Sequence, residues 1–169
     1  MRQFTIPFRG LKEGKHNYEF VADNAFFEQF DSSEVSKGLV KIALEFIKHA
    51  QFLELHFELK GKVTVTCDRC LEPFVMGIEN DAVLYIRFGE KSFEQTGEVV
   101  VLADSTSEIR LDQYVFEYIH LALPYQRIHP EIDGHSGCDP EMLKKLEDHT
   151  ADDESVGEDP RWDKLKGLI

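Results

Sequence analysis

Apolar and polar side chains alternate through much of residues 38–88, and this pattern constrains the fold more than any other feature of the chain. In residues 52–59, four large apolar residues alternate with Glu54, His56 and Glu58. Such alternation is typical of a strand with one face in the core and one in water. Similar runs predict further strands at residues 39–46, 62–66 and 82–88. Gly61 separates two of the runs and predicts a hairpin there.

Short connections between successive strands favour antiparallel pairing. The runs 98–102 and 108–111 have strand-like composition as well and are expected to extend the same sheet. We therefore predict an α+β fold, a single domain with a mainly antiparallel β-sheet or barrel-like body.

Helical spacing of apolar residues appears in four places. Residues 24–30 follow a cap at Asp23 or Asn24 and predict a short helix. Asp112 precedes an apolar stripe that predicts a buried helix near residues 111–123, ended by the proline at position 124. Asp-Pro pairs before residues 141 and 161 predict two short C-terminal helices.

The length of 169 residues suits one domain and is too short for two ordinary ones. We expect a domain at 1–146, an acidic linker at 147–159 and a helix at 160–169 that docks on the domain or on a partner. The linker holds seven acidic and no basic residues, so −7 of the net charge of −13 lies there and −6 elsewhere. Without a signal-like or membrane-spanning apolar run, the protein is expected to be cytoplasmic, with no membrane partner and no evident small-molecule substrate.

Cys67 and Cys70 are separated by two residues at the end of a predicted strand, and Cys138 follows in a loop that also carries His129 and His135. Two thiolates at this spacing can approach one side of a tetrahedral ion, so these five residues are candidate zinc ligands. Buried thiols without a ligand are the plainer interpretation. Redox catalysis is disfavoured because no strand-helix context surrounds the pair.

No arrangement of residues predicts catalysis, and we expect the protein not to be an enzyme. Lys60, Lys62 and Arg69 form a basic group near the cysteine pair, and Arg2, Lys12 and neighbouring residues form another near the N-terminus. Either group is a candidate RNA contact or an ordinary solvated face.

Three blocks resemble the YceD family of bacterial proteins, which also occurs in plastids. They are Cys67-Asp-Arg-Cys70-Leu-Glu-Pro-Phe, then Leu121-Ala-Leu-Pro124 leading to His129 and Cys138, and finally Asp159-Pro-Arg161-Trp162. Many members carry further cysteine pairs after the second block, where this chain has His129, His135 and Cys138. The resemblance covers nearly the whole chain.

The resemblance implies a ribosome-biogenesis factor without catalytic activity that supports synthesis, processing or stability of the large-subunit (23S) rRNA precursor. Its partner would be that RNA, a ribosomal protein or a processing factor, with Lys60, Lys62, Arg69, Arg161 and Trp162 as candidate contacts. The alternative is a zinc-stabilised or redox-responsive protein-interaction module unrelated to ribosomes. A hydrolase or nuclease is a third class, which would require turnover that depends on a cysteine or a metal.

Overall fold

The fold is described from a computed structural model, which covers residues 3–89, 99–132 and 135–149, with only the backbone of Ile132 and His135. Nine strands and three helices lie in these residues. In chain order they are β1 (Thr5–Pro7), β2 (Gly14–Ala22), α1 (Asn24–Phe27), β3 (Val35–Lys48), β4 (Phe52–Thr66), β5 (Pro73–Phe88), β6 (Val99–Leu102), β7 (Glu108–Arg110), α2 (Asp112–Leu121), β8 (Glu131–Ile132), β9 (His135–Ser136) and α3 (Pro140–His149).

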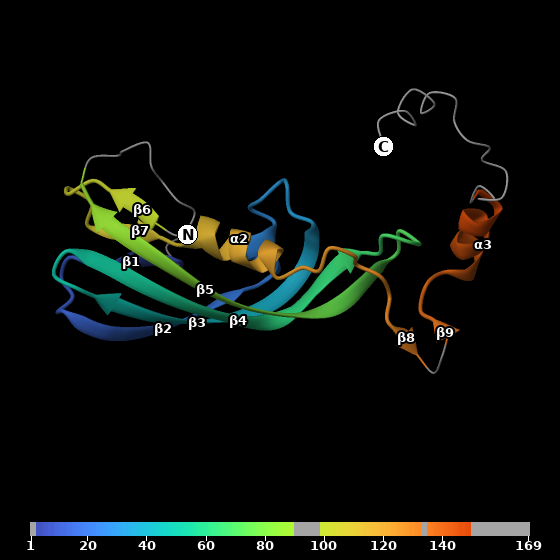
Figure 1. The fold of residues 1–169 in the computed structure, drawn as a ribbon, viewed down its shortest axis with the longest axis horizontal. Helices are drawn as coiled ribbons and strands as arrows, with labels where there is room; N and C mark the ends of the chain where they lie inside the picture. Colours follow the sequence, from blue (N-terminus) through green and yellow to red (C-terminus); the bar gives the residue numbers. More distant parts are fainter. Residues whose placement is uncertain (1–2, 90–98, 133–134, 150–169) are drawn as a thin grey trace, which may run out of the picture.

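Five strands form the main sheet in the order β2-β3-β4-β5-β6, in which β2 to β5 are antiparallel and β6 runs parallel to β5. The prediction of an α+β protein dominated by antiparallel strands is confirmed. The sheet is open, so the prediction of a barrel-like body was wrong. Strands β2 and β6 form its two opposite edges, and no described ladder joins them. Helix α2 lies along one face of the long strands instead (Figure 1).

The alternation in β4 sorts its side chains onto two faces. Its large apolar inward residues, from Leu53 to Val65, are buried between β3 and β5. Its outward residues include Glu58, Lys60 and Lys62, which are exposed. Burial of one face stabilises this arrangement because each large apolar side chain removed from water contributes about 1.5–3 kcal/mol.

Gly61 lies inside β4, opposite Val40 and Ile78, so the hairpin predicted at this glycine was wrong. Strands β3 and β4 approach each other too closely here for any side chain. A β-carbon on Gly61 would stand 2.3 Å from the carbonyl oxygen of Leu39 and 2.6 Å from the α-carbon of Val40. The glycine therefore marks a close backbone approach within one continuous strand, a known use of glycine in sheets.

The two later strand-like runs divide between two sheets. Val99–Leu102 extends the main sheet as β6, as expected. Glu108–Arg110 does not, because β7 pairs with β1 in a separate two-stranded sheet. Ile6 and Ile109 lie opposite each other there and are both buried, so the small sheet contributes its own apolar face to the core.

Helices begin close to the predicted caps. Asp23 caps α1 by accepting from the amide of Phe26, and Asp139 accepts from the amide of Glu141 at the start of α3. In α2, Leu111 occupies the cap position without a side-chain bond, so Asp112 lies in the first turn rather than at the cap. Val115 and Ile119 of α2 are fully buried, which confirms that this helix packs on the core.

None of the described helices has the length and apolar character needed to cross a bilayer. Helix α3 ends at His149, so it includes the first three residues of the predicted acidic linker at 147–159. The rest of the predicted acidic linker and the predicted helix at 160–169 lie outside the described residues.

The close approach at Gly61 predicts that Gly61→Ala destabilises the protein by about 1–3 kcal/mol, because the new methyl group must displace the backbone of β3. Gly77→Ala in β5 is the matched control, since its β-carbon would meet only the oxygen of Gly61 at 3.9 Å. The control is expected to be neutral or slightly stabilising. Urea unfolding of both variants measures the difference, and equal midpoints would contradict a close contact at Gly61.

Candidate metal centre

The turn that joins β4 to β5 carries Cys67 and Cys70 with both side chains buried. The amide of Cys67 donates to the carbonyl of Glu72, and the amide of Leu71 donates to the carbonyl of Cys67, each at 3.0 Å. Leu71 has φ of 63°, a left-handed conformation that reverses the chain directly after Cys70. The amide of Arg69 donates to the sulfur of Cys67 at 3.4 Å.

A second segment, residues 127–138, brings His129 and Cys138 against this turn. The amide of Asp68 donates to the carbonyl of Arg127 at 2.8 Å, and the amide of Arg127 donates to the Asp68 carboxylate at 2.7 Å. This reciprocal pair joins two segments 59 residues apart in sequence. Because Arg127 precedes His129 by two residues, the same contact places the imidazole beside Cys70.

The four side chains Cys67, Cys70, His129 and Cys138 place their ligand atoms within 4.8 Å of one another. Cys67 Sγ lies 3.8 Å from Cys138 Sγ, and His129 Nδ1 lies 3.4 Å from Cys70 Sγ and 3.8 Å from Cys138 Sγ. A tetrahedral zinc ion with bonds of about 2.3 Å to sulfur and 2.0–2.1 Å to nitrogen would separate two sulfurs by about 3.8 Å and a sulfur from a nitrogen by about 3.6 Å. The donor set and these three separations therefore fit a tetrahedral metal site.

Apolar side chains surround the donors. Phe74, Ile128, Met142 and Leu143 pack against the three cysteines, the last two from α3. The ring of Phe74 contacts the imidazole of His129 at a centroid distance of 4.6 Å. This packing limits solvent access to the sulfurs and fixes the imidazole plane, as the environment of a metal site commonly does.

The thiols differ in proton affinity. Burial raises the pKa of Cys67, but hydrogen bonds from the backbone of Cys70, Arg69 and His129 and from the His129 side chain together lower it to about 6. The pKa of Cys138 is raised: a hydrogen bond with Ser136 lowers it, but burial and the neighbouring sulfurs of Cys67 and Cys70 together outweigh that effect. One thiolate thus forms readily and opposes ionisation of its neighbour, because adjacent anions repel each other.

The structure brings together four of the five candidate ligands: Cys67, Cys70, His129 and Cys138. His135 lies in β9, and its side chain is outside the described residues. Of the candidate partner contacts, Lys60 and Lys62 are exposed on the outward face of β4, and Arg69 is exposed in the cysteine turn. Arg161 and Trp162 lie outside the described residues.

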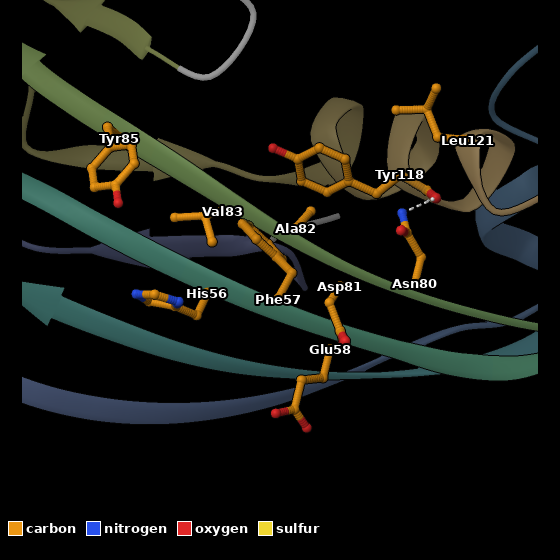
Figure 2. Close-up of a pocket in the computed structure, with 10 residues that line it drawn as sticks. All are labelled: His56, Phe57, Glu58, Asn80, Asp81, Ala82, Val83, Tyr85, Tyr118 and Leu121. Carbon is orange, nitrogen blue, oxygen red and sulfur yellow. Dashed lines mark hydrogen bonds between the residues drawn. The ribbon is translucent and has the colours of Figure 1, made fainter.

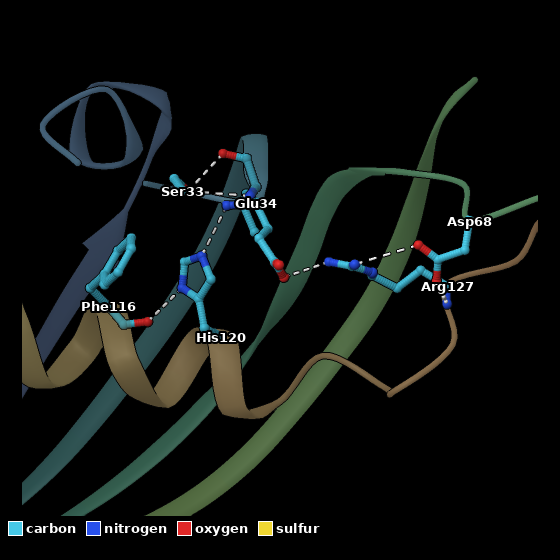
Figure 3. A network of polar contacts seen from close by, with 7 residues as sticks. Ser33, Glu34, Asp68, Phe116, His120 and Arg127 are labelled. Atoms are coloured by element: carbon cyan, nitrogen blue, oxygen red, sulfur yellow. Dashed lines mark hydrogen bonds and ion pairs between the residues drawn. The ribbon is translucent and has the colours of Figure 1, made fainter. Parts of the chain in front are cut away.

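Sequence reasoning missed the polar network that supports the centre (Figure 3). The guanidinium of Arg127 contacts both Glu34, before β3, and Asp68, in the cysteine turn, and its side chain is only 21% exposed. His120, in α2, accepts from the amide of Glu34 through Nε2 and faces the carbonyl of Phe116 through Nδ1. No local motif could have identified these partners, because Glu34 and Arg127 are 93 residues apart.

The fold and the cluster together define an α+β protein with a Cys₃His set able to hold a metal ion. Residues 55–169 match the family described as Large ribosomal RNA subunit accumulation protein YceD. The chain belongs to this family. A search of curated proteins and a search of solved structures each found no match.

The geometry predicts one zinc ion per chain, bound by three sulfurs and one nitrogen. His129→Ala should lower the metal content and reduce unfolding free energy by at least about 2 kcal/mol, because metal binding and folding are coupled. His149→Ala, at the exposed end of α3, is the control and should retain both. Elemental analysis and thermal unfolding with and without a chelator measure these effects; equal metal content in the two variants would exclude His129 as a ligand.

The network predicts that Arg127→Lys lowers stability by about 1–2 kcal/mol, because an ammonium group cannot reproduce the planar fork that contacts two carboxylates. Arg110→Lys is the matched control, since Arg110 pairs with Asp112 two residues away and its side chain is 74% exposed. We expect the control to change stability by less than about 0.5 kcal/mol. Urea unfolding of the zinc-loaded variants makes the comparison, and equal losses would show that Arg127 contributes no more than a surface pair.

Proposed function

We propose that the chain is a non-catalytic ribosome-biogenesis factor that supports synthesis, processing or stability of the large-subunit (23S) rRNA precursor. The observation that carries this proposal is the family membership of residues 55–169. The remaining argument concerns the role of the metal and the surface that meets the partner.

The metal in this proposal is zinc with a structural role. Three cysteines and one histidine supply all four positions of a tetrahedral site, which leaves no open position for a reacting water. The ion would link the β4–β5 turn to the segment that leads into α3. A structural ion of this kind supports the proposal that the protein is not an enzyme.

Lysines on the outward face of the sheet are the proposed RNA contact. Lys41 on β3 lies directly opposite Lys60 on β4, and Lys62 follows two positions later on the same face. Like charges directly opposite each other destabilise a sheet. Lys60 pairs with Glu79, whereas Lys41 and Lys62 have no ion-pair partner among the described residues.

These lysines support contact with RNA phosphates rather than with bases. The net charge of −13 opposes association with nucleic acid, so contact depends on the local positive charge of these lysines. Lysine contacts to phosphates displace counterions and depend strongly on salt concentration. Arg69, exposed in the cysteine turn at the end of the same strand, is a further proposed contact.

Depletion of the protein in its host is expected to lower the ratio of large- to small-subunit rRNA and to change the level of unprocessed precursor. The wild-type gene should restore the ratio. A double variant, Lys41→Glu with Lys62→Glu, should not restore it, because it reverses the charge of the proposed contact without disturbing the core. Lys144→Glu with Lys145→Glu makes the same change in net charge at exposed positions of α3 and should restore the ratio.

RNA measurement by electrophoresis or sequencing distinguishes the outcomes. An unchanged ratio after depletion would contradict the ribosomal role and favour a zinc-stabilised or redox-responsive interaction module of another pathway. A normal ratio with the Lys41/Lys62 variant would retain the ribosomal role and exclude these lysines as its contact. Metal content and unfolding of each variant establish that the effects do not arise from loss of folding.

A further inference from the structure

Most of one edge of β5 has no strand beside it. Its ladder with β4 extends from Pro73 to Arg87, whereas its ladder with β6 covers only Tyr85–Phe88. Among the described strands, residues 73–84 therefore pair on one side only. Unpaired amide and carbonyl groups along such an edge are a template for another strand.

A cavity of about 710 Å³ lies at this edge (Figure 2). Four consecutive β5 residues, Asn80 to Val83, line it. Because neighbouring side chains of a strand point to opposite faces, a cavity that touches all four reaches both faces of the sheet around the edge of β5, with residues 56–58 of β4 behind them. The cavity is therefore placed where an added strand would lie.

Helix α2 provides an apolar wall on the inner side of this edge. Tyr118 contacts the ring of Phe57 at 5.2 Å, and Leu121 is 74% exposed beside it. The side-chain amide of Asn80 donates to the carbonyl of Tyr118 at 2.9 Å, which fixes the helix relative to β5. An apolar side chain entering from this side would bury part of Leu121, whose exposure otherwise costs free energy.

Carboxylates lie on the outer side of the same edge. Glu58 and Asp81 are directly opposite each other on β4 and β5, and both are exposed. Neither has an ion pair among the described residues, and the cavity lining contains no lysine or arginine. Two carboxylates opposite each other repel, so a cation placed between them and the solvent would relieve this repulsion.

We propose that the free edge of β5 binds an extended segment of a partner protein in which basic and apolar residues alternate, and that the segment adds to the sheet as a strand. Its basic side chains would lie on the outer face beside Asp81, with Glu58 one strand further. Its apolar side chains would lie on the inner face beside Tyr118 and Leu121. Backbone pairing supplies affinity in such complexes and alternate side chains supply specificity.

The experiment titrates the full-length, zinc-loaded protein with an acetylated octapeptide of alternating lysine and valine. Amide shifts and hydrogen exchange are followed by NMR. We expect shift changes at residues 78–84 and 118–121, with new exchange protection in β5. Two reference peptides test specificity: alternating glutamate and valine, and four lysines followed by four valines. Each should bind at least about tenfold more weakly, because the glutamate peptide carries the opposite charge and the block peptide lacks the alternation of basic and apolar residues.

Charge variants locate the contact. Asp81→Asn and Glu58→Gln should each weaken peptide binding about three- to tenfold, as expected for loss of one partly desolvated charge contact. Glu79→Gln is the matched control: Glu79 lies two residues from Asp81 on the same face, pairs with Lys60 and does not line this cavity. We expect it to change binding less than about twofold.

The proposal is overturned if the block peptide binds as well as the alternating one, if the three variants behave alike, or if β5 gains no exchange protection. The chain's own residues 160–169, which include Arg161, Lys164 and Lys166, are the competing occupant. A full-length variant with these three changed to glutamine tests this alternative. Shift changes at residues 78–84 without added peptide, together with tighter peptide binding, would assign the edge to that segment. None of these readouts involves rRNA, so the result is independent of the ribosomal role.

Discussion

The register of β4 against its two neighbours is the constraint on which the rest of the structure depends. β4 pairs with β3 and β5 along nearly its whole length, and its inward residues form the centre of the core. A shift of one residue would turn Leu55 and Phe57 outward and bring Glu58 and Lys60 inward. The same register sets the charged rows on the outer face and delivers Cys67 to the end of the sheet, directly after Thr66.

The register of β4 determines where the metal centre lies, but it does not determine which residues complete the centre. Cys67 and Cys70 are placed by a local turn, whereas His129 and Cys138 belong to the segment that follows α2. The paired contacts between Asp68 and Arg127 make that arrival specific, because two backbone amides and one carboxylate are satisfied together. Arg127 then extends the same constraint to Glu34, so the centre, the start of β3 and the segment after α2 form one connected unit.

Local patterns predicted the elements that local physics determines. The alternation in residues 52–59, the apolar stripe of α2 and the caps at Asp23 and Asp139 each depend on neighbours within a few residues, and each was predicted from sequence. Gly61 was misassigned because glycine suits both a turn and a close approach between strands, and only the position of β3 separates these cases. Likewise, β7 pairs with β1 across about a hundred residues, a choice that no local pattern encodes. The choice of His129 depends on the contact between Asp68 and Arg127, which also joins residues distant in sequence.

Basic and acidic side chains on the outer face of the main sheet lie at neighbouring positions along the same strands. Lys41 and Lys60 form one cross-strand pair, and Glu58 and Asp81 form another two residues away along β4. Two residues of strand span about 7 Å, which is shorter than the screening length of about 8 Å at physiological salt. At a distance the electrostatic potentials of the lysine pair and the carboxylate pair largely cancel, so neither pair steers a partner over long range. Each pair therefore attracts only a charged group of a partner that is already close to the sheet. Partners of opposite charge can thus occupy neighbouring parts of one sheet without competing for the same side chains.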